Sequence, residues 1–152
     1  MSILIHRVAA PVSFLCIASF FLTTILVEIY GSAEAVATVK SLIVWPGLLI
    51  LIPAIALTGG SGFWLARSRS GKLLRQKQKR MPFIGANGVL VLIPCAIVLD
   101  RWASAGSLDA TFYTVQGIEL IAGAINLILM GLNMRDGLRM SGRLRSSIPM
   151  NQ

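Results

Sequence analysis

The chain has 152 residues, of which 55% are hydrophobic and 13% charged, and its formal net charge is +8. Its apolar residues gather in four long runs that cover most of the chain, so the sequence excludes a separate soluble domain and predicts one domain, residues 1–152. A β-barrel is excluded as well, because its strands would be about ten residues long and would alternate apolar and polar residues.

Four membrane-spanning helices are predicted in chain order, over Val8–Tyr30, Ser41–Ala66, Pro82–Asp100 and Tyr113–Met134. Each run is close to the about 20 apolar residues that an α-helix needs to cross the hydrocarbon core of a bilayer. Only a compact helical bundle buries so much apolar surface while satisfying its backbone hydrogen bonds. The predicted fold is therefore all-α, a polytopic membrane protein with a bundle of four transmembrane helices.

Positive charge is distributed unevenly between the two sides of this bundle. Arg7 precedes the first span, and only Lys40 and Arg101 are expected on the opposite side. The other basic residues lie in the loop 67–81 (Arg67, Arg69, Lys72, Arg75, Lys77, Lys79, Arg80) and in the tail 135–152 (Arg135, Arg139, Arg143, Arg145). Positive charge in short loops stays in the cytoplasm. Both termini, the loop and the tail are therefore predicted to be cytoplasmic.

The same basic segments are expected to contact the bilayer, because a Lys or Arg near anionic headgroups gains about 1 kcal/mol. The predicted headgroup contacts are Arg67, Arg69, Lys72, Arg75, Lys77, Lys79, Arg80, Arg139 and Arg143. Gly71–Arg80 is a candidate for lying along the inner leaflet. Nucleic acid is not a predicted partner, because no RNA-binding aromatic signature accompanies either basic run.

The first span is expected to be retained rather than cleaved as a signal peptide, because its apolar run exceeds the usual length of about 7–15 residues. His6, the single histidine, precedes it. Haem b usually needs two axial ligands, so His6 is only a remote haem-ligand candidate that needs a second chain or a methionine such as Met130. The simpler interpretation places His6 in a polar N-terminal flank, and no metal site is predicted.

The second span ends in a run of small residues, Thr58–Gly62, with the sequence TGGSG. One interpretation is close helix packing, because glycines let a neighbouring backbone approach. The other is a polar pocket open toward the cytoplasm, walled by Thr58, Ser61, Asn87 of the third span and Asn126 of the fourth. Both interpretations stay open from the sequence.

The fourth span has two distinct faces. At 100° per residue, one stripe contains Gln116, Glu119, Gly123, Asn126, Met130 and Asn133, and the opposite stripe contains Ile118, Ile121, Ile125, Ile128, Leu129 and Leu132. This pattern predicts that the first stripe faces the bundle interior and the second faces lipid.

Glu119 is the strongest candidate for a functional side chain. A carboxylate in hydrocarbon must be protonated, paired or wetted, because its burial without a partner would cost several kcal/mol. The functional interpretation makes Glu119 a proton or cation site. The structural interpretation has it bonded to polar groups of the other spans, or paired with Arg101 near the outer surface.

The TGGSG run, a basic linker ending in KQKRMP and a final GLNMRDGLR together give the chain a family resemblance. It resembles small uncharacterised four-span bacterial inner-membrane proteins that are distantly similar to the copper-resistance D type. The resemblance implies a multi-pass protein of the bacterial cytoplasmic membrane. It assigns no functional residue, because the several membrane histidines expected of a copper or haem binder are missing from this sequence.

The sequence contains neither a Ser–His–Asp set nor a cluster of metal-ligating residues, so a non-enzymatic protein is predicted, with no cofactor required. The first hypothesis is an accessory or self-associating bundle, a homo-oligomer or part of a larger membrane complex, in which Ala9 and Ser13 offer a close contact surface. The alternative is a small transporter or ligand-binding permease. Its ligand or ion site would draw on Glu119, Asn126, Asn87, Thr58, Ser61 and Gln116. A second alternative is a haem or quinone binder in electron transfer.

Overall fold

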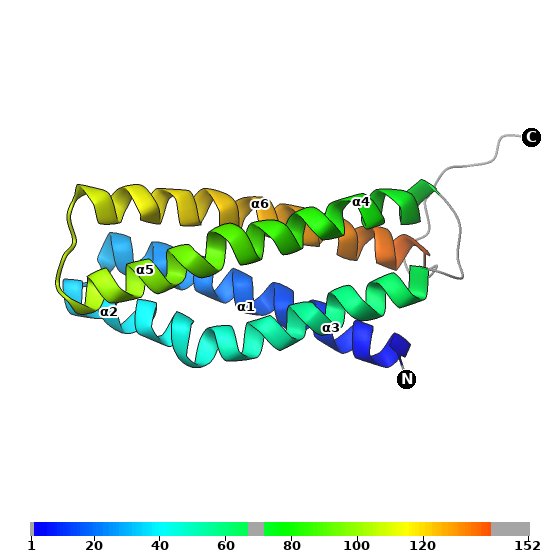
Figure 1. Ribbon diagram of the computed structural model, residues 1–152, viewed down its shortest axis with the longest axis horizontal. Coiled ribbons are helices and arrows are strands. Elements are labelled where there is room, and N and C mark those ends of the chain that lie inside the picture. Colours follow the sequence, from blue (N-terminus) through cyan, green and yellow to red (C-terminus); the bar gives the residue numbers. More distant parts are fainter. Residues whose placement is uncertain (1, 67–71, 141–152) are drawn as a thin grey trace, which may run out of the picture.

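The computed structural model describes residues 2–66 and 72–140, which form four rods that run side by side (Figure 1). The first and last rods are the single helices α1 (Ser2–Tyr30) and α6 (Ala110–Met140). The second consists of α2 (Ala33–Leu42), the π-helical turn η1 (Ile43–Leu48) and α3 (Leu49–Ala66), and the third of α4 (Lys72–Asn87), the π-helical turn η2 (Gly88–Leu92) and α5 (Ile93–Ser104).

Each rod contains a segment that is long and apolar enough to cross a membrane. The four segments are Leu4–Tyr30, Ala33–Trp64, Lys79–Ser104 and Ala110–Arg139. The prediction of an all-α fold with four such helices is confirmed. Every predicted span is extended at one or both ends, because hydropathy marks the apolar middle of a helix, whereas the capping groups determine where its backbone hydrogen bonds begin.

Two capped turns join the rods at one end of the bundle. The hydroxyl of Ser32 accepts a hydrogen bond from the Ala35 amide and starts α2. The carboxylate of Asp109 accepts hydrogen bonds from the first-turn amides of α6, after a turn in which Gly106 has a φ of 72°, a backbone conformation that favours glycine. The start of α1, the start of α4 and the end of α6 lie at the other end (Figure 1).

The second and third rods are not continuous α-helices. Trp45, with φ −136° and ψ 115°, interrupts the second rod just before Pro46, as expected for a residue that precedes proline. In the third rod, the wide turn η2 lies immediately before Pro94, whose ring would clash with a carbonyl of a regular α-helix. The second rod therefore consists of a short outer helix, α2, that changes direction before α3.

α1 packs along α3, and this contact overturns the predicted dimer surface. Ala9 and Ser13 are 6% and 0% exposed, because they are buried against α3 within the same chain. The Ser13 hydroxyl lies 3.4 Å from that of Thr58. The small residues thus permit a close helix–helix contact inside the bundle rather than between two chains.

The predicted loop 67–81 is also different in the structure. From Lys72 onward it is part of α4, so Pro82 lies well inside a helix rather than in a first turn. The segment Lys72–Arg80 continues the axis of the third rod and is not a separate helix along a leaflet. A basic run is compatible with such an extension because Lys and Arg are good helix formers.

Candidate functional site

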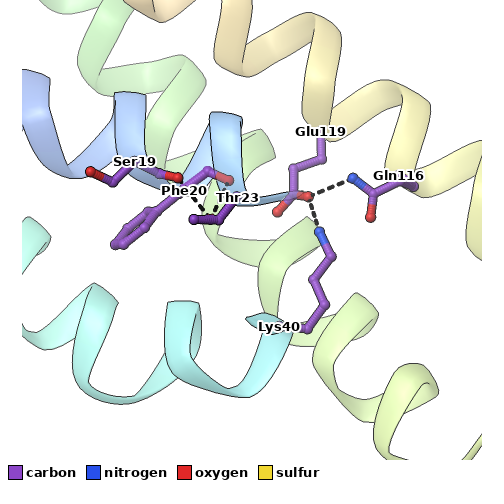
Figure 2. A network of polar contacts seen from close by, with 6 residues as sticks. All are labelled: Ser19, Phe20, Thr23, Lys40, Gln116 and Glu119. Carbon is purple, nitrogen blue, oxygen red and sulfur yellow. Dashed lines mark hydrogen bonds and ion pairs between the residues drawn. The ribbon is translucent and has the colours of Figure 1, made fainter. Parts of the chain in front are cut away.

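A buried ion pair joins the second and fourth rods. The Lys40 ammonium lies 2.5 Å from Glu119 Oε2, and the Lys40 side chain has no exposed surface. Gln116 donates a second hydrogen bond to the same oxygen, at 3.2 Å (Figure 2). The prediction that Glu119 faces the interior within reach of another span is confirmed. Of the two structural alternatives, bonding to a polar group of another rod is observed and pairing with Arg101 is not. The placement of Lys40 outside the bundle was wrong.

Hydropathy places Lys40 just before the second span, so the sequence predicts no role for it inside the bundle. The Ser32 cap starts the helix earlier, which places Lys40 seven residues, or about 10 Å, along it. Glu119 lies nine residues, or about 14 Å, into α6. A buried charge in a membrane helix is stable only with a partner. The sequence signal that could have indicated a buried Lys40 is the apolar stretch on both sides of it.

The surroundings of this pair contain more acceptors than donors. Glu28 of α1 is within electrostatic range of both Lys40 and Glu119. Glu28 Oε1 and Gln116 Oε1 are buried and receive no hydrogen bond from the described part of the chain. Two carboxyl groups, those of Glu28 and Glu119, therefore share the single ammonium of Lys40.

The polar stripe of α6 is buried as predicted. Gln116, Asn126 and Asn133 are 3%, 0% and 8% exposed. On the opposite stripe, Ile121 and Ile128 are 65% and 63% exposed. The periodicity of the sequence therefore orients α6 correctly.

A cavity of about 260 Å³ lies between the four rods, next to the ion pair. Among the described residues that line it, Thr24, Glu119 and Asn126 have polar side chains and the others are apolar. The apolar lining comes from α1, the second rod, the third rod and α6: Ile17, Phe20, Phe21, Ile43, Leu48, Leu51, Ile52, Ile55, Ala56, Ile84, Gly85, Gly88, Val89, Leu92, Ile93, Ala96, Leu120 and Gly123. The two residues of the predicted Glu119/Asn126 site therefore line one cavity.

The cavity reaches the surface of the bundle between α3 and η2. Ile52 and Ala56 of α3 and Val89 of η2 line it and are exposed. Ile52 and Val89 lie near the middle of their rods, which is the depth of lipid chains if these rods cross a bilayer. The opening would then face hydrocarbon rather than water.

Asn87 and Asn126 link α4 to α6. The Asn87 amide donates to Asn126 Oδ1 and to the Ala122 carbonyl, both at 2.9 Å. Asn126 Nδ2 in turn lies 3.4 Å from the Ile84 carbonyl. This mutual bonding leaves Asn126 fixed at the wall of the cavity.

Thr58 and Ser61 belong to a different contact, between α1 and α3. His6 Nδ1 lies 3.2 Å from the Thr58 carbonyl and 3.1 Å from the Ser61 hydroxyl. The predicted pocket walled jointly by Thr58, Ser61, Asn87 and Asn126 is therefore wrong, because the two pairs face different neighbours. His6 also lies at a helix contact rather than in a free polar flank.

Close helix packing explains only part of the glycine run Thr58–Gly62. A Cβ at Gly62 would lie 2.7 Å from Met81 Cε, so this glycine permits the close approach of α4. At Gly59 and Gly60, a Cβ would meet no atom within 4 Å. Close packing within the chain thus accounts for Gly62 only.

Among the predicted headgroup contacts, Arg75, Lys79 and Arg139 are exposed. Arg80 instead donates to Asp136 Oδ2 at 2.8 Å, and Asp136 is 1% exposed. Arg135 also approaches this carboxylate, at 3.5 Å. Arg67, Arg69, Arg143 and the side chains of Lys72 and Lys77 lie outside the described residues. Asp136 was not among the predicted site residues, although it is an acidic residue inside a basic segment.

Within the described residues there is no group of three or more His, Cys, Asp and Glu side chains that could hold a metal ion. Met130 is buried in an apolar cluster with Ile17, Leu48, Leu51 and Ile84. Comparison with protein-family models, curated proteins and solved structures finds no match for this chain. The resemblance to the copper-resistance D type stays a prediction.

Proposed function

We propose that this protein is a non-enzymatic, multi-pass membrane protein that binds a lipid-soluble small molecule between its four helical rods. The observation that carries the proposal is the cavity of about 260 Å³, lined by apolar side chains together with Glu119 and Asn126. Ligand sites in proteins commonly combine an apolar lining with a few polar groups that orient the ligand.

The size of the cavity supports an occupant. An enclosed, empty cavity of this volume would cost about 6 kcal/mol at about 24 cal/mol per Å³, so a space of this size that opens at the bundle surface is expected to be filled by a lipid chain or a ligand. An apolar cavity does not recover that cost by taking up water, which needs polar partners. A packed accessory bundle, the first hypothesis from the sequence, gives no reason for such a space.

The route into the cavity favours a ligand that dissolves in the bilayer. The opening between Ile52 and Val89 lies near the middle of two rods that are long enough to cross a membrane. A water-soluble ligand would have to cross lipid to reach it, whereas a lipophilic ligand is concentrated there.

The proposed setting is the bacterial inner membrane, with both termini and the basic segment 67–81 in the cytoplasm. The uneven distribution of Lys and Arg supports this orientation. The start of α1, the start of α4 and the end of α6 lie at the same end of the bundle, which agrees with it (Figure 1).

Two glycine variants provide a matched test. Gly85 lines the cavity and Gly60 does not, and a Cβ at either position meets no atom within 4 Å. We expect Gly85→Phe to fill the cavity and Gly60→Phe to leave it open. In nanodiscs of zwitterionic lipid, equilibrium dialysis with 4-phenylbutanol should show saturable binding near one equivalent per chain for the wild type and Gly60→Phe. Gly85→Phe should lose it, and equal binding to all three proteins would contradict the proposal.

A further inference from the structure

Glu119 is the point at which the ion pair and the cavity meet. Lys40 and Gln116 both bond to its Oε2 oxygen, and neither of them lines the cavity. The other carboxylate oxygen points away from these two donors (Figure 2). The Glu119 side chain is 13% exposed and is part of the cavity wall. One carboxylate therefore serves Lys40 on one side and remains available to a ligand on the other.

The electrostatic balance around this carboxylate favours a positively charged donor. Two carboxyl groups, those of Glu28 and Glu119, lie within electrostatic range of a single ammonium, that of Lys40. Glu28 Oε1 and Gln116 Oε1 are buried acceptors that receive no hydrogen bond within the described part of the chain. An anionic or purely accepting ligand would increase both imbalances.

We infer that the cavity selects a lipid-soluble ammonium ion, whose N–H group donates to Glu119 and whose apolar body occupies the space between α3 and η2. This inference rests on the proposed function, because it names the chemical class of the ligand for the same cavity. A cavity of about 150 Å³ accommodates benzene, with its six carbon atoms, so a volume of about 260 Å³ accommodates a ligand of about ten or eleven non-hydrogen atoms.

The roles of the two charged partners lead to opposite expectations. A charge-assisted hydrogen bond contributes about 1.5–3 kcal/mol, which corresponds to at least a tenfold change in affinity. Glu119→Gln should therefore remove the preference for an ammonium group. Lys40→Met removes the competing cation and should strengthen ammonium binding. A purely structural pair would instead weaken the binding of every probe alike in both variants.

Three probes of nearly the same shape test this selectivity: 4-phenylbutylammonium, 4-phenylbutanol and methyl 4-phenylbutyl ether. Each is dialysed at pH 7 against the protein in zwitterionic nanodiscs, and the amount bound to Gly85→Phe is subtracted. We expect the ammonium ion to bind at least about tenfold more tightly than the ether. In Glu119→Gln the two should bind within about threefold of each other, with ether affinity unchanged. In Lys40→Met the affinity for the ammonium ion should rise, again with that for the ether unchanged.

Each single variant leaves one buried charged group without its partner. The double variant Lys40→Met/Glu119→Gln removes both charges and therefore leaves no unpaired charge in the interior. It should bind the ether like the wild type and show no ammonium preference. If all three probes bind the wild type equally, the inference is wrong and the proposed function stands. If the double variant retains the ammonium preference, the inference is also wrong. If no probe binds saturably, the proposed function fails, and the inference fails with it.

Discussion

Removing Lys40 tests the most consequential contact in this structure. Lys40→Met keeps a long, unbranched side chain but removes the charge from a position with no exposed surface. The Glu119 carboxylate then remains in the interior with Gln116 as its hydrogen-bond donor. We expect a large loss of stability, although Lys40 lies in a stretch that the sequence analysis treated as a connecting loop.

The magnitude follows from the geometry. Two unit charges 2.5 Å apart attract each other by about 7 kcal/mol at an effective dielectric constant of about 20. Desolvation of the two ions, at several kcal/mol each, offsets most of this attraction, so the intact pair contributes little net stability. Loss of one partner is different, because the desolvation of the other is no longer compensated and costs about 3–5 kcal/mol.

We therefore expect Lys40→Met to lower the free energy of unfolding by about 3–5 kcal/mol. Glu119→Gln should cost a similar amount, because it leaves the Lys40 ammonium without its counter-ion. The double variant should lie within about 1–2 kcal/mol of the wild type, since both charges are then absent. The measurement is unfolding by SDS titration in mixed micelles, followed by circular dichroism and fluorescence, as a double-mutant cycle.

Arg101→Met is the matched control. Arg101 lies at the same end of the bundle but is exposed, and it was one of the alternative partners of Glu119 predicted from the sequence. Its replacement should change the free energy of unfolding by no more than about 0.5 kcal/mol. If Arg101→Met is more damaging than Lys40→Met, or if the two single changes at Lys40 and Glu119 add in the double variant, the reasoning about the ion pair is refuted.

Two further predictions concern the other end of the bundle and the orientation. Arg80→Gln should lower the free energy of unfolding by about 1–3 kcal/mol in the same assay, because it leaves the Asp136 carboxylate buried with a weaker donor. The control is Lys79→Gln, which changes the neighbouring, exposed residue and should have almost no effect on that free energy. Equal losses for the two variants would mean that the pairing of Arg80 does not matter. In a cysteine-free background, an impermeant thiol reagent should label Ser107→Cys but not Gln76→Cys in intact cells, and the reverse pattern would overturn the proposed cytoplasmic position of the basic segment.

Local patterns determined much of this architecture. Hydropathy alone located the four helices, because each apolar run has the length of a membrane-spanning helix and is longer than a typical apolar stretch in a soluble protein. The helical periodicity of the fourth span also oriented it correctly, with Asn126 inside and Ile128 outside. Both results depend on properties of a single helix, namely its length and the angle between successive side chains.

The contacts between helices required the tertiary structure. Lys40 and Glu119 are 79 positions apart, and nothing in the sequence distinguishes Lys40 from Arg101 as the partner until the packing of α2 against its neighbours is known. The same holds for Ser13, which was expected to contact a second chain and instead packs against Thr58. Which faces meet depends on how each rod is rotated and shifted relative to the others, a property that no single helix encodes.

The cavity was decided in the same way. Its apolar lining consists of residue types that also form closely packed cores, so the sequence does not predict that they enclose a cavity. The second rod changes direction at Trp45 and the third contains the wide turn η2 before Pro94, and residues of both rods line the cavity. Prolines in the sequence indicate that bends are possible, but the direction of a bend, and therefore the volume enclosed beside Glu119, depends on all four rods packing together.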